Sequence, residues 1–181
     1  MKTGKATAGS AVVAFLVILS LIVIDLTKTF QERGFDVALA PALDPAMGGN
    51  GRVPFDVLDQ GPFQMYLTGY LVSIAALVVG VGFLLFAATS YSRSEEITRT
   101  VTRSLSWASF AVLFWGIGEF ITHMGNNFAA NRLGLLEHWS QISGTTNQSL
   151  IVWLILLALL GFVSTLMDRS LKLQEDQEGL V

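Results

Sequence analysis

Two histidines and a glutamate between Trp115 and Gln141 are the residues of this chain best suited to binding a metal. Glu119 and His123 are four residues apart, so on a helix they lie on one face about one turn apart. His138, the only other histidine, follows on a connecting segment that could return toward them. Two imidazoles and a carboxylate are sufficient ligands for zinc, copper or non-haem iron with open coordination positions. The pattern therefore predicts a site for one copper or zinc ion.

The same residues also fit an interpretation without a metal. Glu119 and His123 can form a simple hydrogen bond near a helix end, and His138 beside Trp139 can act as an anchor among lipid headgroups. Asp25 could add another carboxylate, although Lys28 nearby in the sequence is its more ordinary partner.

Composition decides which class of protein must position these residues. Hydrophobic residues make up 52% of the 181 residues and charged residues only 14%, whereas a soluble domain is about 25% charged. Mean hydropathy is +0.57. A chain so poor in charge cannot cover a globular surface with polar groups, so we expect a lipid bilayer to solvate much of it.

Charge and cysteine content exclude further classes. The net charge of −3 and the absence of a long basic cluster argue against nucleic acid as a partner. The chain has no cysteine, which excludes a disulfide framework, a thiolate nucleophile and a cysteine-ligated metal.

Four apolar segments are long enough to cross a bilayer, which takes roughly 20 residues in a helix. We predict an all-α fold, an integral membrane four-helix bundle in which residues 1–181 form a single transmembrane domain. The predicted spans are residues 9–26, 63–88, 104–122 and 150–166. The first segment has a basic start but lacks a well-placed cleavage site, so we interpret it as a retained span and not a signal peptide.

Lysines and arginines predict the orientation, because they favour the cytoplasmic side. Seven of them lie at the two termini and in the connection between the second and third spans. The other four are spread over the longer loops, residues 28–62 and 123–148. Both termini are therefore predicted to be cytoplasmic and both long loops outer.

The two predicted outer loops carry apolar residues that a flexible linker would leave exposed. In loop 28–62 they accompany four prolines and five glycines, so we expect this loop to fold back as a cap or to lie against a neighbouring subunit. In loop 123–148 they recur at a helical period, which predicts an amphipathic helix on the membrane surface. These residues are Phe35, Val37, Leu39, Leu43, Val53, Phe55, Val57 and Leu58 in the first loop and Phe128, Leu135, Trp139 and Ile142 in the second.

Small residues recur in the second and third spans at about four-residue spacing. Such residues let helix backbones approach closely in lipid. They predict close packing, either within this four-helix unit or against another subunit. The residues are Gly69, Ser73, Ala76, Gly80 and Gly82 in the second span and Ala108, Ala111, Gly116 and Gly118 in the third.

The order Glu119-x₃-His123 followed by His138-Trp139 resembles a motif in a membrane subunit of the copper membrane monooxygenases, the particulate methane and ammonia oxidisers. In that family an amide or carboxylate, a histidine four residues on, and a histidine followed by tryptophan bind copper between two spans. The segment 61–70 also resembles the aromatic stretch that opens the family's previous span.

The resemblance implies a copper ligand set of Glu119, His123 and His138, in an oxidoreductase complex. It covers about half the chain and does not extend to the family's second metal site. That site has an aspartate with a histidine four residues on, whereas Thr29 follows Asp25 here. A relative with these departures would be a degenerate or accessory one.

No catalytic machinery is visible in the chain alone. It shows no nucleophile–base pair, no nucleotide-binding loop and no charged residue at the centre of a span. We therefore interpret the protein as a non-catalytic or accessory subunit of a larger membrane complex, in contact with lipid and with other membrane subunits. The alternatives are a copper-binding monooxygenase or oxidase subunit, and a small transporter or channel.

Overall fold

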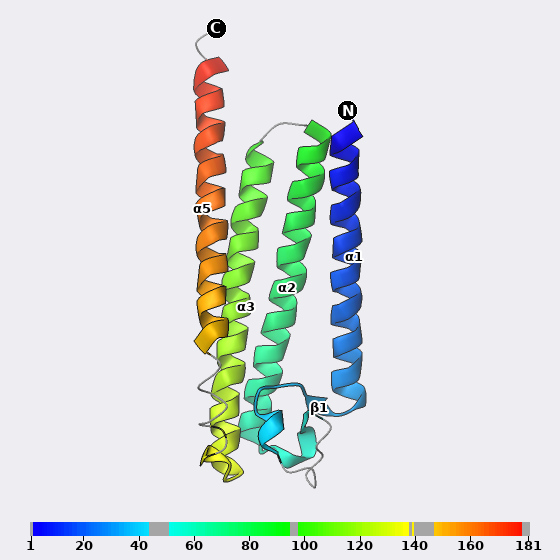
Figure 1. Ribbon diagram of the computed structural model, residues 1–181, viewed down its shortest axis with the longest axis vertical. Helices are drawn as coiled ribbons and strands as arrows, with labels where there is room; N and C mark the ends of the chain where they lie inside the picture. The colour runs from blue at the N-terminus through cyan, green and yellow to red at the C-terminus, as the bar shows by residue number, and fades with distance from the viewer. Residues whose placement is uncertain (1, 44–50, 95–97, 138, 140–146, 179–181) are drawn as a thin grey trace. The chain divides into compact units, whose positions relative to one another are not determined.

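A computed structural model describes residues 2–43, 51–94, 98–137, 139 and 147–178 (Figure 1). The described residues form four long helices, all long and apolar enough to cross a membrane. The all-α fold is thus confirmed, and the chain is a multi-pass integral membrane protein. The helices are α1 (Lys2–Gln31), α2 (Gln60–Ser94), α3 (Arg99–Arg132) and α5 (Asn147–Glu178).

The helices are longer than the apolar runs that predicted them. α1 continues past residue 26 to Gln31, and α2 begins at Gln60 with Pro62 in its first turn, where a missing N–H costs nothing. α3 continues past residue 122 to Arg132. Polar residues extend each helix beyond the predicted span, so both predicted outer loops are shorter than expected.

The predicted surface helix after Gly125 is wrong in its start and its extent. Phe128 belongs to α3, whereas Leu135 follows a turn at Gly134, whose φ is +70°. The Leu135 N–H donates to the Ala130 carbonyl at 2.8 Å, the bond that commonly closes a helix at such a glycine. Gly125 does not break the helix, because it lies against the ring of Tyr66. Ile142, also predicted on this surface helix, lies outside the described residues.

The chain divides into two compact units. Unit 1 comprises Met1–Ser20, Ala76–Leu113 and Trp153–Val181, and unit 2 comprises Leu21–Ala75 and Phe114–Val152. α1, α2 and α3 each contribute one segment to either unit. Each unit is described below by itself.

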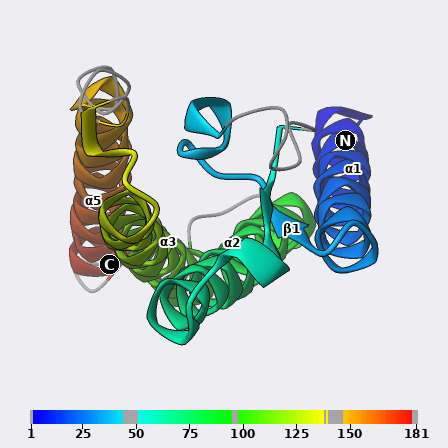
Figure 2. The same cartoon turned by 90° about the horizontal axis from the view of Figure 1, so that it is seen from below.

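Unit 2 contains a hydrophobic core built largely from the loop between α1 and α2. After α1, Arg33 adopts a left-handed conformation (φ 48°) and leads into strand β1 (Gly34–Phe35), which pairs antiparallel with β2 (Val53–Pro54). Figure 2 shows β1 between α1 and α2. The loop also contains two 3-10 helices, η1 (Ala40–Ala42) and η3 (Phe55–Val57).

The apolar residues of this loop are buried against α2 and α3. The Phe35 ring lies 4.7 Å from that of Phe55 and 5.5 Å from that of Tyr66, between centroids. Each buried large side chain contributes on the order of 2 kcal/mol to folding, so the loop is a packed element. The core residues are Phe35, Leu39, Ala40, Leu43, Val53, Tyr66, Ala129, Ala130 and Trp139.

Unit 1 is held together by small residues and a few polar contacts. A Cβ added at Gly80 of α2 would lie 3.0 Å from the Cβ of Ala111 on α3. The Trp153 indole of α5 donates to the Val112 carbonyl at 2.9 Å, and Ser106 and Ser164 bond at 2.8 Å. α3 therefore contacts α2 on one side and α5 on another.

The small residues of unit 2 also pack α2 against α3. A Cβ added at Gly69 would lie 2.8 Å from the Gly118 carbonyl, and one added at Gly118 would lie 2.8 Å from the Gly69 carbonyl. Backbones approach this closely only where neither residue has a side chain. At these positions the stripe serves contact within the chain.

Candidate functional site

Three polar side chains lie on one face of α2 in unit 2. Tyr66, Tyr70 and Ser73 are separated by four and three residues, the spacing that places side chains on a single helix face. Each bonds a different partner on another helix. This polar face, formed by Tyr66, Tyr70 and Ser73, organises the candidate site.

Tyr66 makes the most buried of these bonds. Its hydroxyl donates to the Asn126 side-chain carbonyl at 2.8 Å, and the two residues are 0% and 3% exposed. A buried polar atom left without a partner costs about 1–3 kcal/mol, so the two residues hold each other in place. Their bond joins α2 to α3 beside the core.

Tyr70 connects the polar face to a group of charges at the end of α1. Its hydroxyl donates to the Asp25 carboxylate at 2.8 Å, and the guanidinium of Arg52 lies 3.6 Å from the other oxygen of Asp25. Arg52 precedes β2, so the partner of Asp25 comes from the folded loop. The expected pairing of Asp25 with Lys28 is wrong, because Arg52 and Tyr70 take its place.

Arg52 is the central charge of this group. Its side chain is 9% exposed, and its Nε lies 3.1 Å from the Glu32 carboxylate. One terminal nitrogen donates to the Thr29 hydroxyl and to the Gly34 carbonyl, both at 3.1 Å. A buried guanidinium is tolerated only when charge partners and acceptors surround it. Arg52 therefore fastens the loop to the end of α1.

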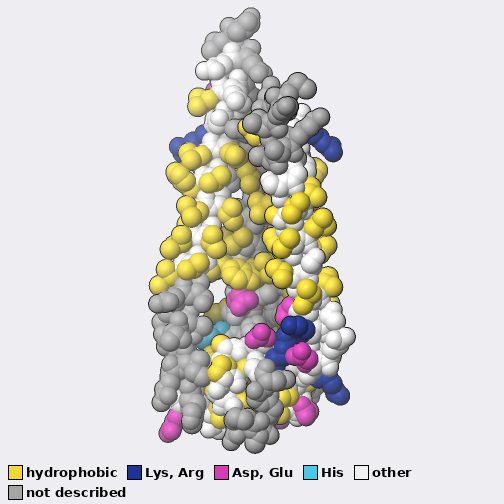
Figure 3. Space-filling model, turned by 45° about the vertical axis from the view of Figure 1, so that its right-hand side comes forward, with side chains coloured by type: hydrophobic (Ala, Val, Ile, Leu, Met, Phe, Trp, Pro, Cys, Tyr) yellow, Lys and Arg dark blue, Asp and Glu magenta, His cyan; other side chains and the backbone are white. Residues whose placement is uncertain are grey.

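The arginine cluster is defined as Arg52, Asp25, Glu32, Thr29 and Tyr70. Figure 3 shows acidic and basic side chains lying against one another on one face of the molecule. Asp25 and Glu32 are each 45% exposed, so one side of the cluster is open while the arginine is covered. An arrangement of this kind holds structure and also presents two carboxylates.

Glu119 and His123 lie on α3, as the spacing predicted, but they have separate partners. The Glu119 carboxylate accepts a bond from the Ser73 hydroxyl at 3.3 Å. The His123 ring lies 5.7 Å from the ring of Trp139, between centroids. Within the described residues the predicted Glu119–His123 hydrogen bond is not formed, and the carboxylate is turned toward α2.

Trp139 brings the segment after α3 back onto that helix. The residue is 3% exposed, and its indole N–H donates to the Asn127 side chain. The turn at Gly134 makes this return possible. His138 itself lies outside the described residues, although its neighbour in the chain contacts His123.

No group of three histidines, cysteines, aspartates or glutamates suited to a metal occurs among the residues that the structure describes. Because His138 is not among them, the predicted ligand set of Glu119, His123 and His138 stays a prediction. Glu119 and His123 share a helix face, and Trp139 supplies the return of the chain that the set requires.

Sequence analysis did not single out Arg52, Tyr66, Tyr70 or Asn126. The spacing of Tyr66, Tyr70 and Ser73 was a usable signal, because three polar residues on one face of an apolar span call for partners. Nothing local marks Arg52 as a buried residue, since its partners come from α1 and from the turn before β1.

The polar face is confined to one end of α2. From residue 74 to residue 88 the sequence contains no polar side chain, a distance of about 22 Å along a helix. A conduit lined by α2 would need polar groups along this length. The site is therefore suited to binding or recognition at one end of the spans.

The comparisons with known proteins give no relative for this arrangement. No family model, no curated protein and no solved structure matches the chain. The resemblance to the copper membrane monooxygenases consequently stays a prediction from residues Glu119, His123, His138 and Trp139.

Proposed function

We propose that this protein is a non-catalytic or accessory integral-membrane subunit of a larger membrane complex. In this role unit 2 presents a folded surface, with the loop between α1 and α2 as its cap, and the apolar helices provide contact with lipid and with other subunits. The arginine cluster holds that cap to α1.

The observation that supports this proposal is how little of the spans the chain itself covers. In the most apolar part of the α5 span 0% of residues are buried, and in that of α1 only 6%. Association in lipid relies on close packing and polar contacts, and few of either engage α5. Such helices have large surfaces available for partner subunits.

α5 has one face toward α3 and another that the chain leaves exposed. Its less exposed residues recur at spacings of three and four and include Trp153 and Ser164, both bonded to α3. The exposed face contains Ile155, Leu159 and Phe162, and it is the face on which we expect a partner.

Site-specific photocrosslinking in native membranes tests this assignment. A photoreactive residue at Leu159 or Phe162 should give discrete heavier products, because a neighbouring subunit holds a fixed position. The matched control is the same photoreactive residue at Leu157, on the face toward α3, which should crosslink only within the chain. Products absent from Leu159 and Phe162 would leave lipid as the sole neighbour and refute the proposal for α5.

The orientation belongs to the same proposal. Seven of the eleven lysines and arginines support cytoplasmic termini and outer loops. Topology reporters fused after Gly49 and after Val181 should therefore report opposite sides of the membrane. Reporters on the same side would contradict this orientation.

A second candidate function is a copper-binding subunit of a membrane monooxygenase or oxidase. The contact of Trp139 with His123 favours it, because it returns the chain that carries His138 to the helix of Glu119 and His123. One copper or zinc ion held by two imidazoles and a carboxylate would retain open positions for a substrate or for water.

Metal analysis of the purified protein tests this second candidate. Wild type should hold about one metal per chain, and His138→Ala should lose most of it, since two ligands hold a metal poorly. Glu137→Gln is the matched control, because it alters the neighbouring carboxylate and none of the three predicted ligands. Wild type without metal after purification without chelators would eliminate the candidate and leave the accessory role untouched.

A further inference from the structure

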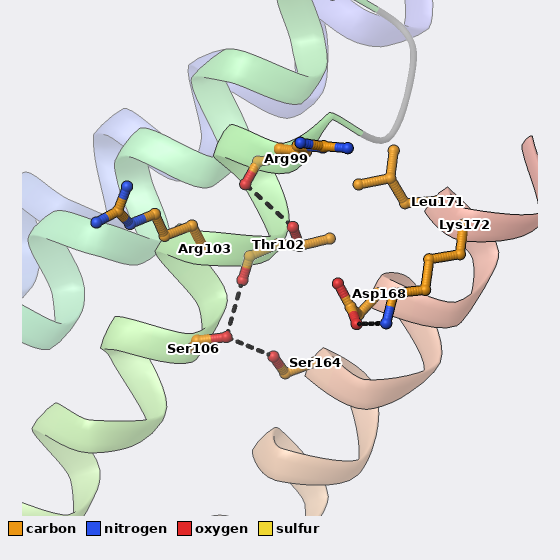
Figure 4. Close-up of a pocket in the computed structure, with 8 residues that line it drawn as sticks. All are labelled: Arg99, Thr102, Arg103, Ser106, Ser164, Asp168, Leu171 and Lys172. Carbon is orange, nitrogen blue, oxygen red and sulfur yellow. Dashed lines mark hydrogen bonds and ion pairs between the residues drawn. The ribbon is translucent and has the colours of Figure 1, made fainter. Parts of the chain in front are cut away.

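Unit 1 contains a cavity between α3 and α5, at the end of each helix rich in basic residues. Its volume is about 410 Å³, within the range of small-molecule sites. Figure 4 shows its lining side chains, which come from the first turns of α3 and from the later turns of α5. They are Arg99, Thr102, Arg103, Ser106, Ser164, Asp168, Leu171 and Lys172.

Charge is the first property of this α3–α5 cavity. Its lining contains three basic residues and one acidic residue, Asp168, which lies 3.2 Å from the ammonium of Lys172. In Figure 4 Arg99 extends from α3 toward Leu171 of α5, whereas the guanidinium of Arg103 points to the other side of α3. Arg99 and Lys172 therefore supply positive charge from opposite walls.

The hydroxyl groups form the base of the cavity and hold its walls together. Ser106 donates to the Thr102 carbonyl at 3.1 Å, so in its 2.8 Å bond with Ser164 the donor is Ser164. Thr102 donates to the Arg99 carbonyl at 3.0 Å. Because these hydroxyl hydrogens are engaged, an anion in the cavity would be recognised by the basic side chains.

The position of the cavity along the spans indicates the source of the anion. The candidate span of α3 begins at Arg99, and that of α5 ends at Gln174. Arg99 and Lys172 thus lie at the boundary between the apolar part of each helix and water. Phospholipid phosphates occupy this depth in a bilayer, and basic pockets between spans bind such headgroups.

We propose that the α3–α5 cavity binds the phosphate of an anionic phospholipid headgroup. Arg99 and Lys172 contact the phosphate from the two helices, and the acyl chains follow the exposed apolar surface of α5. The bound lipid joins α3 to α5 at an end where their described polar contact is the Ser106–Ser164 bond. This inference does not depend on the proposed accessory role.

Native mass spectrometry of the intact protein, released from nanodiscs, tests the lipid. The nanodiscs contain phosphatidylcholine with either phosphatidylglycerol or phosphatidylethanolamine as the second lipid. We expect phosphatidylglycerol to be retained in preference to the other two. Each of Arg99→Gln and Lys172→Gln should weaken retention about fivefold, the usual contribution of one basic residue at an anionic surface.

Asp168→Asn is the most discriminating variant. It removes the only acidic residue of the lining, so it should strengthen retention of phosphatidylglycerol. A site for the amine of phosphatidylethanolamine would instead lose affinity in this variant, which would overturn the proposal. Arg99→Lys keeps the charge and should restore most of the retention lost in Arg99→Gln.

Arg93→Gln is the matched control, since it removes an exposed basic residue at the end of α2 that does not line the cavity. It should leave retention unchanged. Equal retention of all three lipids, or an Arg99→Gln/Lys172→Gln double variant that behaves like Arg93→Gln, would overturn the proposal. Displacement of the lipid by inorganic phosphate alone would assign the site to a soluble phosphate and refute the lipid as its ligand.

Discussion

The two units of this chain are built in different ways from the same helices. In unit 2 the buried residues include large side chains such as Phe35 and Tyr66, and polar bonds join residues far apart in the sequence. In unit 1 the buried residues are mostly small, for example Ala108 and Ala111. Unit 2 resembles the core of a soluble protein, whereas unit 1 resembles helices that meet in lipid.

This difference indicates where specificity lies. Aromatic packing and a buried arginine define a single arrangement of the loop in unit 2, because few alternatives satisfy every charge and hydrogen bond. Contacts between small residues in unit 1 allow close approach and leave most apolar surface exposed. Substitutions should therefore have large effects in unit 2 and small effects in unit 1.

The largest expected effect is that of Arg52→Met in unit 2. It removes two ion pairs and the bonds to Thr29 and Gly34, so we expect a loss of about 3 kcal/mol in the free energy of unfolding. Reversible unfolding in mixed detergent micelles measures this loss, and hydrogen exchange should show the loop opening first.

Arg132→Met is the matched control for Arg52→Met. Its pair with Asp59 spans 3.9 Å between side chains that are more than half exposed, so the change should stay within about 0.5 kcal/mol. Equal effects of the two variants would mean that the arginine cluster contributes no more than a surface ion pair, and the contrast between the units would lose its main support.

The next largest effect is expected for Gly118→Ala. The new Cβ would lie 2.8 Å from the Gly69 carbonyl and against the Ser73 hydroxyl, so α2 and α3 must separate at a loss of about 2 kcal/mol. Gly161→Ala in α5 is the control, because nothing lies within 4 Å of its new Cβ. If both variants unfold like wild type, the close approach of α2 and α3 is not a constraint.

The spans could be predicted from the sequence because apolar runs of this length have few alternatives. Their ends could not, since polar residues such as those after Thr122 continue α3 without changing its composition gradually. Gly125 looked like a helix end and is a packing position against Tyr66. The real stop, Gly134, depends on a backbone conformation that spacing alone does not reveal.

The candidate site was predictable only where its residues are close in sequence. Glu119 and His123 are placed together by one helix turn, and this much follows from spacing. The partners of Asp25 and Tyr66 come from other elements, which only the folded loop and the pairing of helices bring near. Lys28 looked like the natural partner of Asp25 because sequence analysis considers neighbours first.

A moderate effect is expected for Tyr66→Phe. The substitution keeps the ring in the core and leaves the buried Asn126 without its donor, at a loss of about 1–2 kcal/mol. Thermal unfolding in detergent measures it. In the double variant Tyr66→Phe/Asn126→Leu both polar partners are gone, so part of the loss should return; no recovery would mean that the hydrogen bond is not what matters.

The smallest effect is expected from two glycines of α2 in unit 1. A Cβ at Gly80 meets the Cβ of Ala111 at 3.0 Å, so Gly80→Ala should lower the free energy of unfolding by about 1 kcal/mol or less, since a methyl group can yield slightly. At Gly82 nothing lies within 4 Å, and alanine favours the helix by up to about 1 kcal/mol, so Gly82→Ala should be neutral or stabilising.

The pair Gly80→Leu and Gly82→Leu turns this small contrast into a test of what covers unit 1. A leucine side chain at position 80 cannot fit against Ala111, so Gly80→Leu should reduce stability even when the protein is purified alone. Gly82→Leu should be harmless in isolation, and in native membranes it should weaken assembly only if a partner subunit lies against that face. Measuring stability and co-purification for both variants separates contact within the chain from contact with a partner. If Gly82→Leu destabilised the isolated protein as much as Gly80→Leu, α2 would be packed on both sides, and unit 1 would be less open than its exposed side chains indicate.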